Sequence, residues 1–210
     1  MKCALTMLLL ILVTHPTFAQ NAPASAGHST PIPANETFRQ PSFRLSLPLP
    51  AGWHIASQEV SDFRKQKAMD LAQVDAAGHQ QARERVRRLI VVQRHPSGTA
   101  RGTNTSFSIN STFAGSALVG MTARQYQEAV VEQLMASGMK AEIRSMPTET
   151  KLGGRVFSKV ETKITFKGFD VYQLQYDCFD GEYILNIQIA APSVQELADT
   201  DRLIANIAFE

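Results

Sequence analysis

The stretch 171-VYQLQYDCFDGEYILNIQIAAPSVQEL-197 decides the fold class. Asp180-Gly181 in its middle is a hairpin signal, because both residue types tolerate a positive φ. Apolar and polar residues alternate over 183–189, which is the pattern of a half-buried strand. Ser193 and Glu196 then have the spacing of a capping box that starts a helix. The stretch therefore predicts two antiparallel strands followed by a helix.

The sequence on either side of this stretch carries similar signals. Further strands are predicted over 43–49, 88–94, 105–113, 141–149 and 155–166. A helix is predicted after Thr122, which forms a capping-box pattern with Gln125, and Gly138 supplies its left-handed end. Short hairpins predict an antiparallel sheet, and strands apolar on both faces, such as 89–92, predict helices on both sides. We therefore expect an α+β fold, an α/β/α sandwich with a central, mainly antiparallel sheet flanked by helices.

Composition divides the chain into three segments. Residues 1–19 have the layout of a signal peptide, with a positive start, an apolar run and small residues at the end. Cleavage is expected between Ala19 and Gln20. Residues 20–40 are rich in Pro, Ala, Ser and Thr, which predicts a flexible tether. A single folded domain is expected over 41–210, because a segment of this length buries an adequate core without disulfides.

The N-terminal apolar run predicts export. Residues 4–13 supply about half of the roughly 20 residues that a membrane-spanning helix needs, so we expect no stable membrane insertion. Retention as an N-terminal anchor is the alternative. Cys3 precedes the apolar run, so it does not lie where a lipoprotein cysteine would. We expect a soluble periplasmic or secreted product, and 21 basic against 19 acidic side chains give no reason to expect nucleic acid.

Basic residues cluster in one part of the sequence. Arg83, Arg85, Arg87 and Arg88 are a candidate interaction surface for an anion or an acidic protein. The alternative is a solvated helix end whose charges neighbouring acidic residues balance. Trp53, at a turn, is expected to be a buried or rim aromatic, with ligand stacking as the alternative.

Patterns for catalysis, cofactors or metals are weak. The segment 115-GSA-117 lacks the strand–turn–helix context of a nucleophilic serine, and Gly153-Gly154 lies at a strand–strand turn where a phosphate loop would precede a helix. We expect no cofactor. A metal site built from His54 and His95 stays open beside solvated or core-edge histidines. Cys178 is expected to be a small buried hydrophobe, with a reactive or intermolecular thiol as the alternative.

Several turn and strand motifs resemble PsbP-like domains. They are 43-FRLSLPLPAGW-53, 152-LGG-154 and 191-APS-193. The resemblance spans roughly residues 40 to 210, and it implies an α/β/α sandwich. That fold is shared by an extrinsic photosystem II protein, a Ran-binding nuclear import factor and small exported bacterial proteins. The resemblance implies no catalytic residues, and the loosely helical pattern of residues 59–87 is where this protein would differ.

These observations favour an exported, non-enzymatic domain that binds a protein or assembles on the cell envelope. This expectation rests on analogy of fold and names no particular partner. The alternatives are a periplasmic small-molecule or metal-binding protein and an enzyme of unrecognised type. The sequence does not indicate an oligomeric state.

Export makes a direct prediction about the mature N-terminus. Protein recovered from the cell envelope or the medium should begin at Gln20, because cleavage requires small residues such as Ala19 immediately before the cut. N-terminal sequencing measures this. An Ala19→Arg variant should keep the uncleaved N-terminus, whereas a wild-type chain that still begins at Met1 would contradict export with cleavage.

Overall fold

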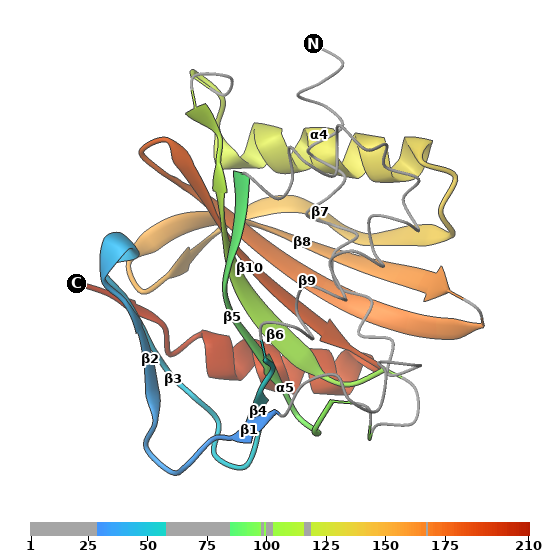
Figure 1. Ribbon diagram of the computed structural model, residues 1–210. Helices are drawn as coiled ribbons and strands as arrows, with labels where there is room; N and C mark the ends of the chain where they lie inside the picture. The colour runs from blue at the N-terminus through green and yellow to red at the C-terminus, as the bar shows by residue number, and fades with distance from the viewer. Residues whose placement is uncertain (1–28, 58–84, 98, 100–102, 116–118, 167) are drawn as a thin grey trace.

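The computed structural model describes residues 29–57, 85–97, 99, 103–115, 119–166 and 168–210 (Figure 1). Its strands are β1 (Thr30–Pro31), β2 (Thr37–Gln40), β3 (Leu45–Pro48), β4 (His54–Ile55), β5 (Val86–Gln93), β6 (Ser106–Phe113), β7 (Ala141–Leu152), β8 (Arg155–Phe166), β9 (Phe169–Asp180), β10 (Tyr183–Ala191) and β11 (Ala208–Phe209). Its helices are α4 (Ala123–Ala136), α5 (Val194–Ile204) and the 3-10 turn η1 (Pro41–Phe43). None of the helices in this part of the chain is both long and apolar enough to cross a membrane.

An eight-stranded sheet with the order β1-β4-β5-β6-β10-β9-β8-β7 forms the centre of the molecule. Every adjacent pair of strands in it is antiparallel. The hairpin predicted at Asp180-Gly181 joins β9 to β10, and Gly181 has the expected positive φ of 60°. The prediction of an α+β fold with a mainly antiparallel sheet is therefore confirmed.

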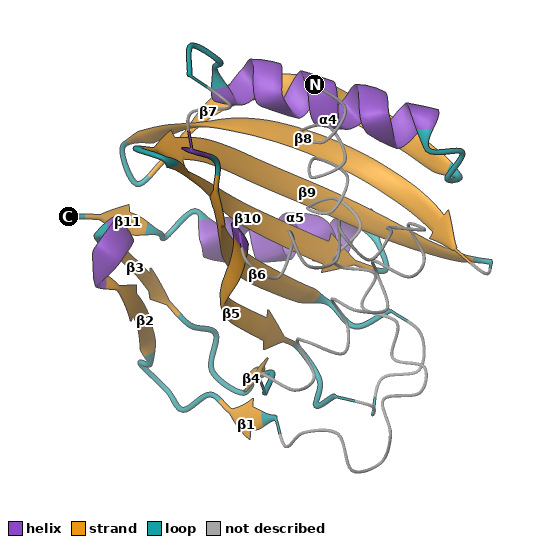
Figure 2. Cartoon of the chain, turned by 45° about the horizontal axis from the view of Figure 1, so that its top comes forward, coloured by secondary structure: helices purple, strands orange, loops and turns teal. Residues whose placement is uncertain are grey.

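The two faces of this sheet contact different helices (Figure 2). Successive residues of a strand point to opposite faces, so Ile184 and Leu185 of β10 lie on different sides. Ile184 packs with Tyr126, Val130 and Leu134 of α4. Leu185 belongs to the larger cluster, here called the main core, which also contains Leu197 and Ile204 of α5. Both faces of β10 are therefore buried.

Local signals explain where α4 begins and ends. Thr122 Oγ1 accepts a hydrogen bond from Gln125 N at 3.1 Å, and Gln125 Oε1 accepts one from Thr122 N at 2.9 Å. This is the predicted capping box. Gly138 follows the helix with a φ of 74°, as expected for a left-handed end. At α5, Ser193 accepts from Glu196 N, but the Glu196 carboxylate contacts Arg94 and Thr105.

A second, three-stranded sheet with the order β11-β3-β2 was not expected from the sequence. The predicted strand 43–49 became η1 and β3, and β3 lies outside the central sheet. Residues 30–40, which the sequence analysis assigned to a tether, contain β1 and β2, and Ile32 is buried. Their polar, Pro-containing composition is typical of tethers, but it also suits short edge strands. Residues 20–28 and almost all of the helical pattern at 59–87 lie outside the described residues.

The small sheet packs closely against the turn between β7 and β8. A Cβ atom at Gly153 would lie 2.7 Å from the Ile207 carbonyl oxygen and 2.9 Å from the Phe209 ring. Gly154 also has a positive φ, but no atom lies within 4 Å of its Cβ position. Only Gly153 therefore combines a left-handed backbone with close tertiary contact.

This contrast predicts different costs for two neighbouring substitutions. Gly154→Ala should lower the free energy of unfolding by about 1–2 kcal/mol, because an L residue there is strained. Gly153→Ala should cost about 1–3 kcal/mol more, because the new methyl group also overlaps backbone atoms. Urea denaturation of both variants measures the difference. Equal destabilisation would contradict the close packing of this turn on the C-terminal strand.

Candidate functional site

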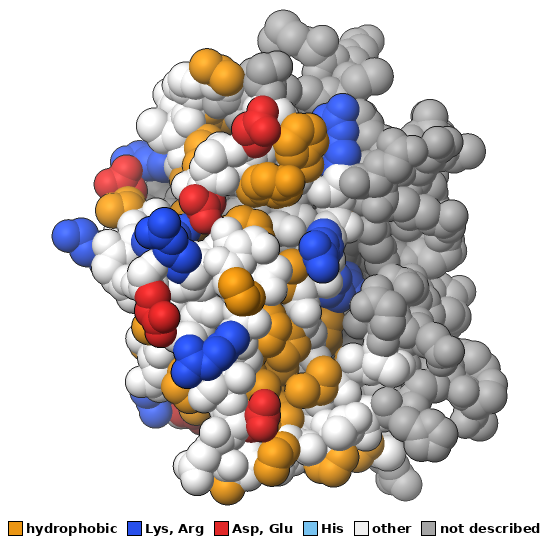
Figure 3. Space-filling view, turned by 60° about the vertical axis from the view of Figure 1, so that its left-hand side comes forward, with side chains coloured by type: hydrophobic (Ala, Val, Ile, Leu, Met, Phe, Trp, Pro, Cys, Tyr) orange, Lys and Arg blue, Asp and Glu red, His pale blue; other side chains and the backbone are white. Residues whose placement is uncertain are grey.

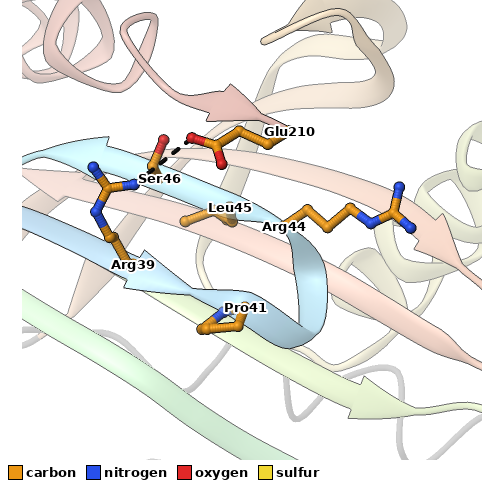
Figure 4. A pocket seen from close by; sticks show the side chains of 6 residues that line it. All are labelled: Arg39, Pro41, Arg44, Leu45, Ser46 and Glu210. Carbon is orange, nitrogen blue, oxygen red and sulfur yellow. Dashed lines mark ion pairs between the residues drawn. The ribbon is translucent and has the colours of Figure 1, made fainter.

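A groove of about 480 Å³ crosses the small sheet, and Figure 4 shows its lining. We call it the arginine groove. Its lining residues are Arg39, Pro41, Arg44, Leu45, Ser46 and Glu210.

Strand register sets the floor of the arginine groove. Arg39 of β2 pairs with Ser46 of β3, and Ser46 pairs with Ala208 of β11, so the three side chains share one face. The neighbouring residue Leu45 points the other way and is buried in the main core. Two small side chains beside a long arginine leave the outer face of the sheet hollow.

Arg44 has an unusual backbone for an arginine. Its φ of 51° and ψ of 33° place it in the left-handed region directly after η1. Glycine or asparagine is usual at such a position, because an L side chain there costs about 1–2 kcal/mol. Two backbone hydrogen bonds hold the conformation, from Arg44 N to Pro41 O and from Glu210 N to Arg44 O. The C-terminal strand thus fixes Arg44 at the edge of the groove.

The charges around the arginine groove are incompletely paired. Arg39 and Glu210 form an ion pair at 3.7 Å, with side chains that are 66% and 77% exposed. Ion pairs this exposed contribute about 0–1 kcal/mol. The Arg44 guanidinium has no ion pair or hydrogen bond within the part of the chain that the structure describes. In Figure 4 the Arg44 side chain extends away from Arg39, at the opposite end of the groove.

A second candidate region is the face of the central sheet that α4 packs on, and we call it the polar face. On strands β5, β6, β9 and β10 this face is largely polar, yet its side chains are buried. Its buried polar residues include Gln93, Ser106, Ser108, Asn110, Gln173, Gln175, Asp177, Asn186 and Gln188. Buried polar groups require hydrogen-bond partners, so this face is a candidate for a binding role.

Asp177 is the centre of a hydrogen-bond network on the polar face. Its carboxylate accepts hydrogen bonds from Gln127 of α4 at 2.8 Å, from Gln175 at 2.7 Å and from Asn186 at 2.8 Å. Asn186 in turn accepts from Asn110 at 3.1 Å. The network therefore joins α4 to three strands through one fully buried carboxylate.

Burial dominates the electrostatics of this network. It raises the pKa of Asp177 to about 6, although the three amide donors act in the opposite direction. No arginine or lysine forms an ion pair with Asp177 among the residues in the described ranges. Burial and the nearby Asp177 charge also raise the pKa of Tyr126 well above its usual range. The polar face thus contains a carboxyl group that titrates near neutral pH.

The structure does not gather the arginines of the predicted interaction surface into one patch. Arg83 lies outside the described residues, and Arg85 immediately precedes β5. Arg87 pairs with Ser111 and Arg88 with Asn110, so the two side chains point to opposite faces of the sheet. The residues that line the arginine groove come from short strands without a periodic pattern, which is why the sequence did not indicate them.

Trp53, His54 and His95 lie near β4 and β5, toward one edge of the central sheet. Trp53 is half-buried, packs against the main core and has its ring 6.3 Å from that of Phe107. This is the expected rim aromatic. His54 pairs with Gln93 in β4, while the backbone of His95 exchanges two hydrogen bonds with the Asn104 side chain. No group of three or more metal-ligating side chains occurs within the described ranges.

Cys178 lies on the face of β9 opposite Asp177, in the main core. Burial raises the pKa of its thiol to about 12, which disfavours the reactive thiolate. The prediction of a small buried hydrophobe in a strand is therefore confirmed.

Comparison with known proteins gives only distant structural likenesses. No family model matches the chain, and no curated protein matches it in sequence. The chain is similar to cyanobacterial PsbP (CyanoP) from Synechocystis over 91% of its own length and 99% of that protein, with 11% identity and a TM-score of 0.49. It is also similar to a protein of unknown function from Pseudomonas aeruginosa, over 56% of its own length and 73% of that protein, with 13% identity and a TM-score of 0.36. Likenesses this weak assign neither family nor function, so membership in the PsbP-like domains stays a prediction.

The buried Asp177 predicts a pH dependence of stability. Its pKa is higher in the folded chain than in the unfolded one, so the folded state binds more protons between these two values. The contribution of Asp177 is therefore greatest below pH 4 and is lost as the pH rises to about 6, a change of about 3 kcal/mol. Denaturant titrations from pH 3.5 to 7.5 should show this fall in the wild type and a smaller fall in Asp177→Asn. Parallel curves would contradict the raised pKa.

Proposed function

We propose that this protein is an exported, non-enzymatic binding domain that holds an acidic segment of a partner protein in the arginine groove. The supporting observation is that two arginines line one hollow on the outer face of the small sheet, with a single exposed carboxylate, Glu210, between them. We further infer that the domain is the α/β/α sandwich of PsbP-like proteins.

The chemistry of the arginine groove suits carboxylates. A guanidinium donates two parallel hydrogen bonds to one carboxylate, so each arginine is a specific binding site for an acidic side chain. An incoming carboxylate must compete with Glu210 for Arg39, but that ion pair is long and solvent-exposed. Arg44 needs no displacement, because no described residue occupies its guanidinium.

An exposed aromatic pair next to the arginine groove supports a protein partner. Phe113 and Tyr183 are 38% and 43% exposed, with ring centres 5.5 Å apart. The Tyr183 ring also lies 6.0 Å from that of Phe43, the residue before Arg44. Tyrosine and arginine are the residue types that contribute most binding energy in protein interfaces. Figure 3 views the molecule from the side of η1 and shows hydrophobic, basic and acidic side chains interspersed there.

The proposal predicts binding of acidic peptides. The purified mature protein should bind hexaglutamate, and the affinity should fall as salt increases because the contacts are exposed ion pairs. Arg39→Ala and Arg44→Gly should each weaken binding about tenfold, equivalent to about 1.4 kcal/mol. Isothermal titration at low salt measures both.

Two controls separate the groove from general charge effects. Arg124→Ala removes an equal charge from the surface of α4, where Arg124 pairs with Glu128, and it should leave the affinity within about twofold. Arg44→Gly should also stabilise the fold, because glycine is unstrained at a φ of 51°. Absence of hexaglutamate binding, or equal weakening by Arg124→Ala, would exclude the groove as the site.

The alternative function, a small-molecule binding protein, is favoured by a different observation. The polar face contains buried carbonyl oxygens for which the described chain supplies no donor. That region is independent of the arginine groove, because it lies on the central sheet.

A further inference from the structure

Strand β2 forms one edge of the small sheet, whose strand order is β11-β3-β2 (Figure 2). An edge strand has one row of backbone N–H and C=O groups that no neighbouring strand pairs, so it is a template for another extended chain. The arginine groove crosses the same sheet, and Arg39 of β2 lines it. The open edge and the groove therefore meet at one residue.

The pairing of β2 with β3 shows which residues turn their backbone to the open edge. In an antiparallel pair of strands, hydrogen-bonded and non-hydrogen-bonded residue pairs alternate. Leu49 N donates to Glu36 O at 2.8 Å, so the next pair, Thr37 with Pro48, is not hydrogen-bonded, in agreement with the missing N–H of proline. Arg39 lies two residues further along β2 and has the same phase. The N–H and C=O groups of Thr37 and Arg39 therefore point away from β3.

The pairing of β3 with β11 gives the same result for Arg39. Glu210 N donates to Arg44 O at 2.9 Å, so the backbone of Ser46, two residues along β3, also bonds to β11. Ser46 lies opposite Arg39, and it cannot direct its N–H and C=O groups to both neighbouring strands. Beyond strand pairing, no backbone hydrogen bond to Arg39 occurs among the residues that the structure describes.

The direction of the side chains adds a chemical requirement to this edge. An antiparallel strand added to β2 would place one residue directly opposite Arg39, bonded to its backbone and with its side chain on the same face. That face contains the arginine groove, so a carboxylate there lies beside the Arg39 guanidinium. The flanking residues of the added strand would point to the other face, beside Phe38, which packs against the main core. Acidic residues that alternate with apolar ones therefore suit both faces.

We propose that the acidic segment of the partner protein binds as an extended strand that pairs antiparallel with the open edge of β2. This inference rests on the function proposed above, and it adds the conformation and the sequence pattern of the ligand. The antiparallel orientation is expected because such pairing is slightly more stable per residue than parallel pairing. A second copy of this chain is disfavoured as the occupant, because its own β2 would bring another Arg39 beside the first.

Backbone methylation of the ligand tests the pairing directly. An acetylated six-residue peptide of alternating Glu and Val is compared in isothermal titration with a version N-methylated at every Glu and a version N-methylated at every Val. The Glu residues opposite Thr37 and Arg39 direct their N–H groups to β2, so their methylation should weaken binding at least tenfold. The Val N–H groups point away from β2, so methylation there should leave the affinity within about twofold. Equal affinities of the two methylated peptides, or weakening by Val methylation alone, would overturn antiparallel pairing.

Substitutions of Thr37 test the same edge from the side of the protein. Thr37→Pro removes an N–H that points to the open edge and no hydrogen bond to β3, and proline is tolerated in edge strands. This variant should bind the unmodified peptide at least tenfold more weakly than Thr37→Val, which keeps the N–H. Circular dichroism and cooperative unfolding verify that both variants are folded. Equal affinities of the two folded variants would overturn the pairing.

The outcomes separate this inference from the function on which it rests. If hexaglutamate binds with the expected dependence on Arg39 and Arg44 but both methylated peptides bind as tightly as the unmodified one, the arginine groove stands and strand pairing is wrong. If no acidic peptide binds at all, the groove is wrong as well.

Discussion

The pairing of β9 with β10 is the constraint on which the rest of the structure depends. Both strands are buried on both faces, with apolar side chains facing α5 and mostly polar ones facing the other side. A slip of one residue would exchange these faces, placing Asp177 in the main core and Leu185 among amides. The tight turn at Gly181 and the opposite chemistry of the two faces therefore specify the same register. Strands β6 and β8 then align on this hairpin.

Asp177 contributes specificity more than stability. Burying a carboxylate costs several kcal/mol. The hydrogen bonds from its three amide partners offset only part of this cost. The raised pKa is the sign of that incomplete compensation. In exchange, Gln127 can satisfy its bonds to Asp177 and Ser158 in only one placement of α4 on the sheet. The same network also orients Gln175, whose Nε2 donates to the Asp177 carboxylate.

Elements with complete local signals could be predicted from the sequence, and elements defined by tertiary contacts could not. The β9–β10 hairpin and α4 have a turn, a cap or a periodic stripe within a few residues. By contrast, β11 has two residues, and β2 becomes a strand only because β3 lies beside it. The arginine groove depends on these short strands. The alternation over 183–189 predicts that Asn186 and Gln188 form the polar side of a strand, but their burial depends on the tertiary fold.

The two candidate sites have opposite electrostatics because they lie on different sheets. The arginine groove is open, and its guanidiniums are solvated, so it favours anions weakly and reversibly. The polar face is buried, where a single carboxylate influences its surroundings more strongly because water does not screen it. The main core, to which Leu45, Leu47 and Ile207 contribute, and the Arg155 side chain of β8, which donates to the Phe43 carbonyl oxygen, both join the central sheet to the small sheet. Among the described residues, the hydrogen bonds of the Asp177 network do not reach the residues that line the arginine groove, so ligands at the two sites should bind independently.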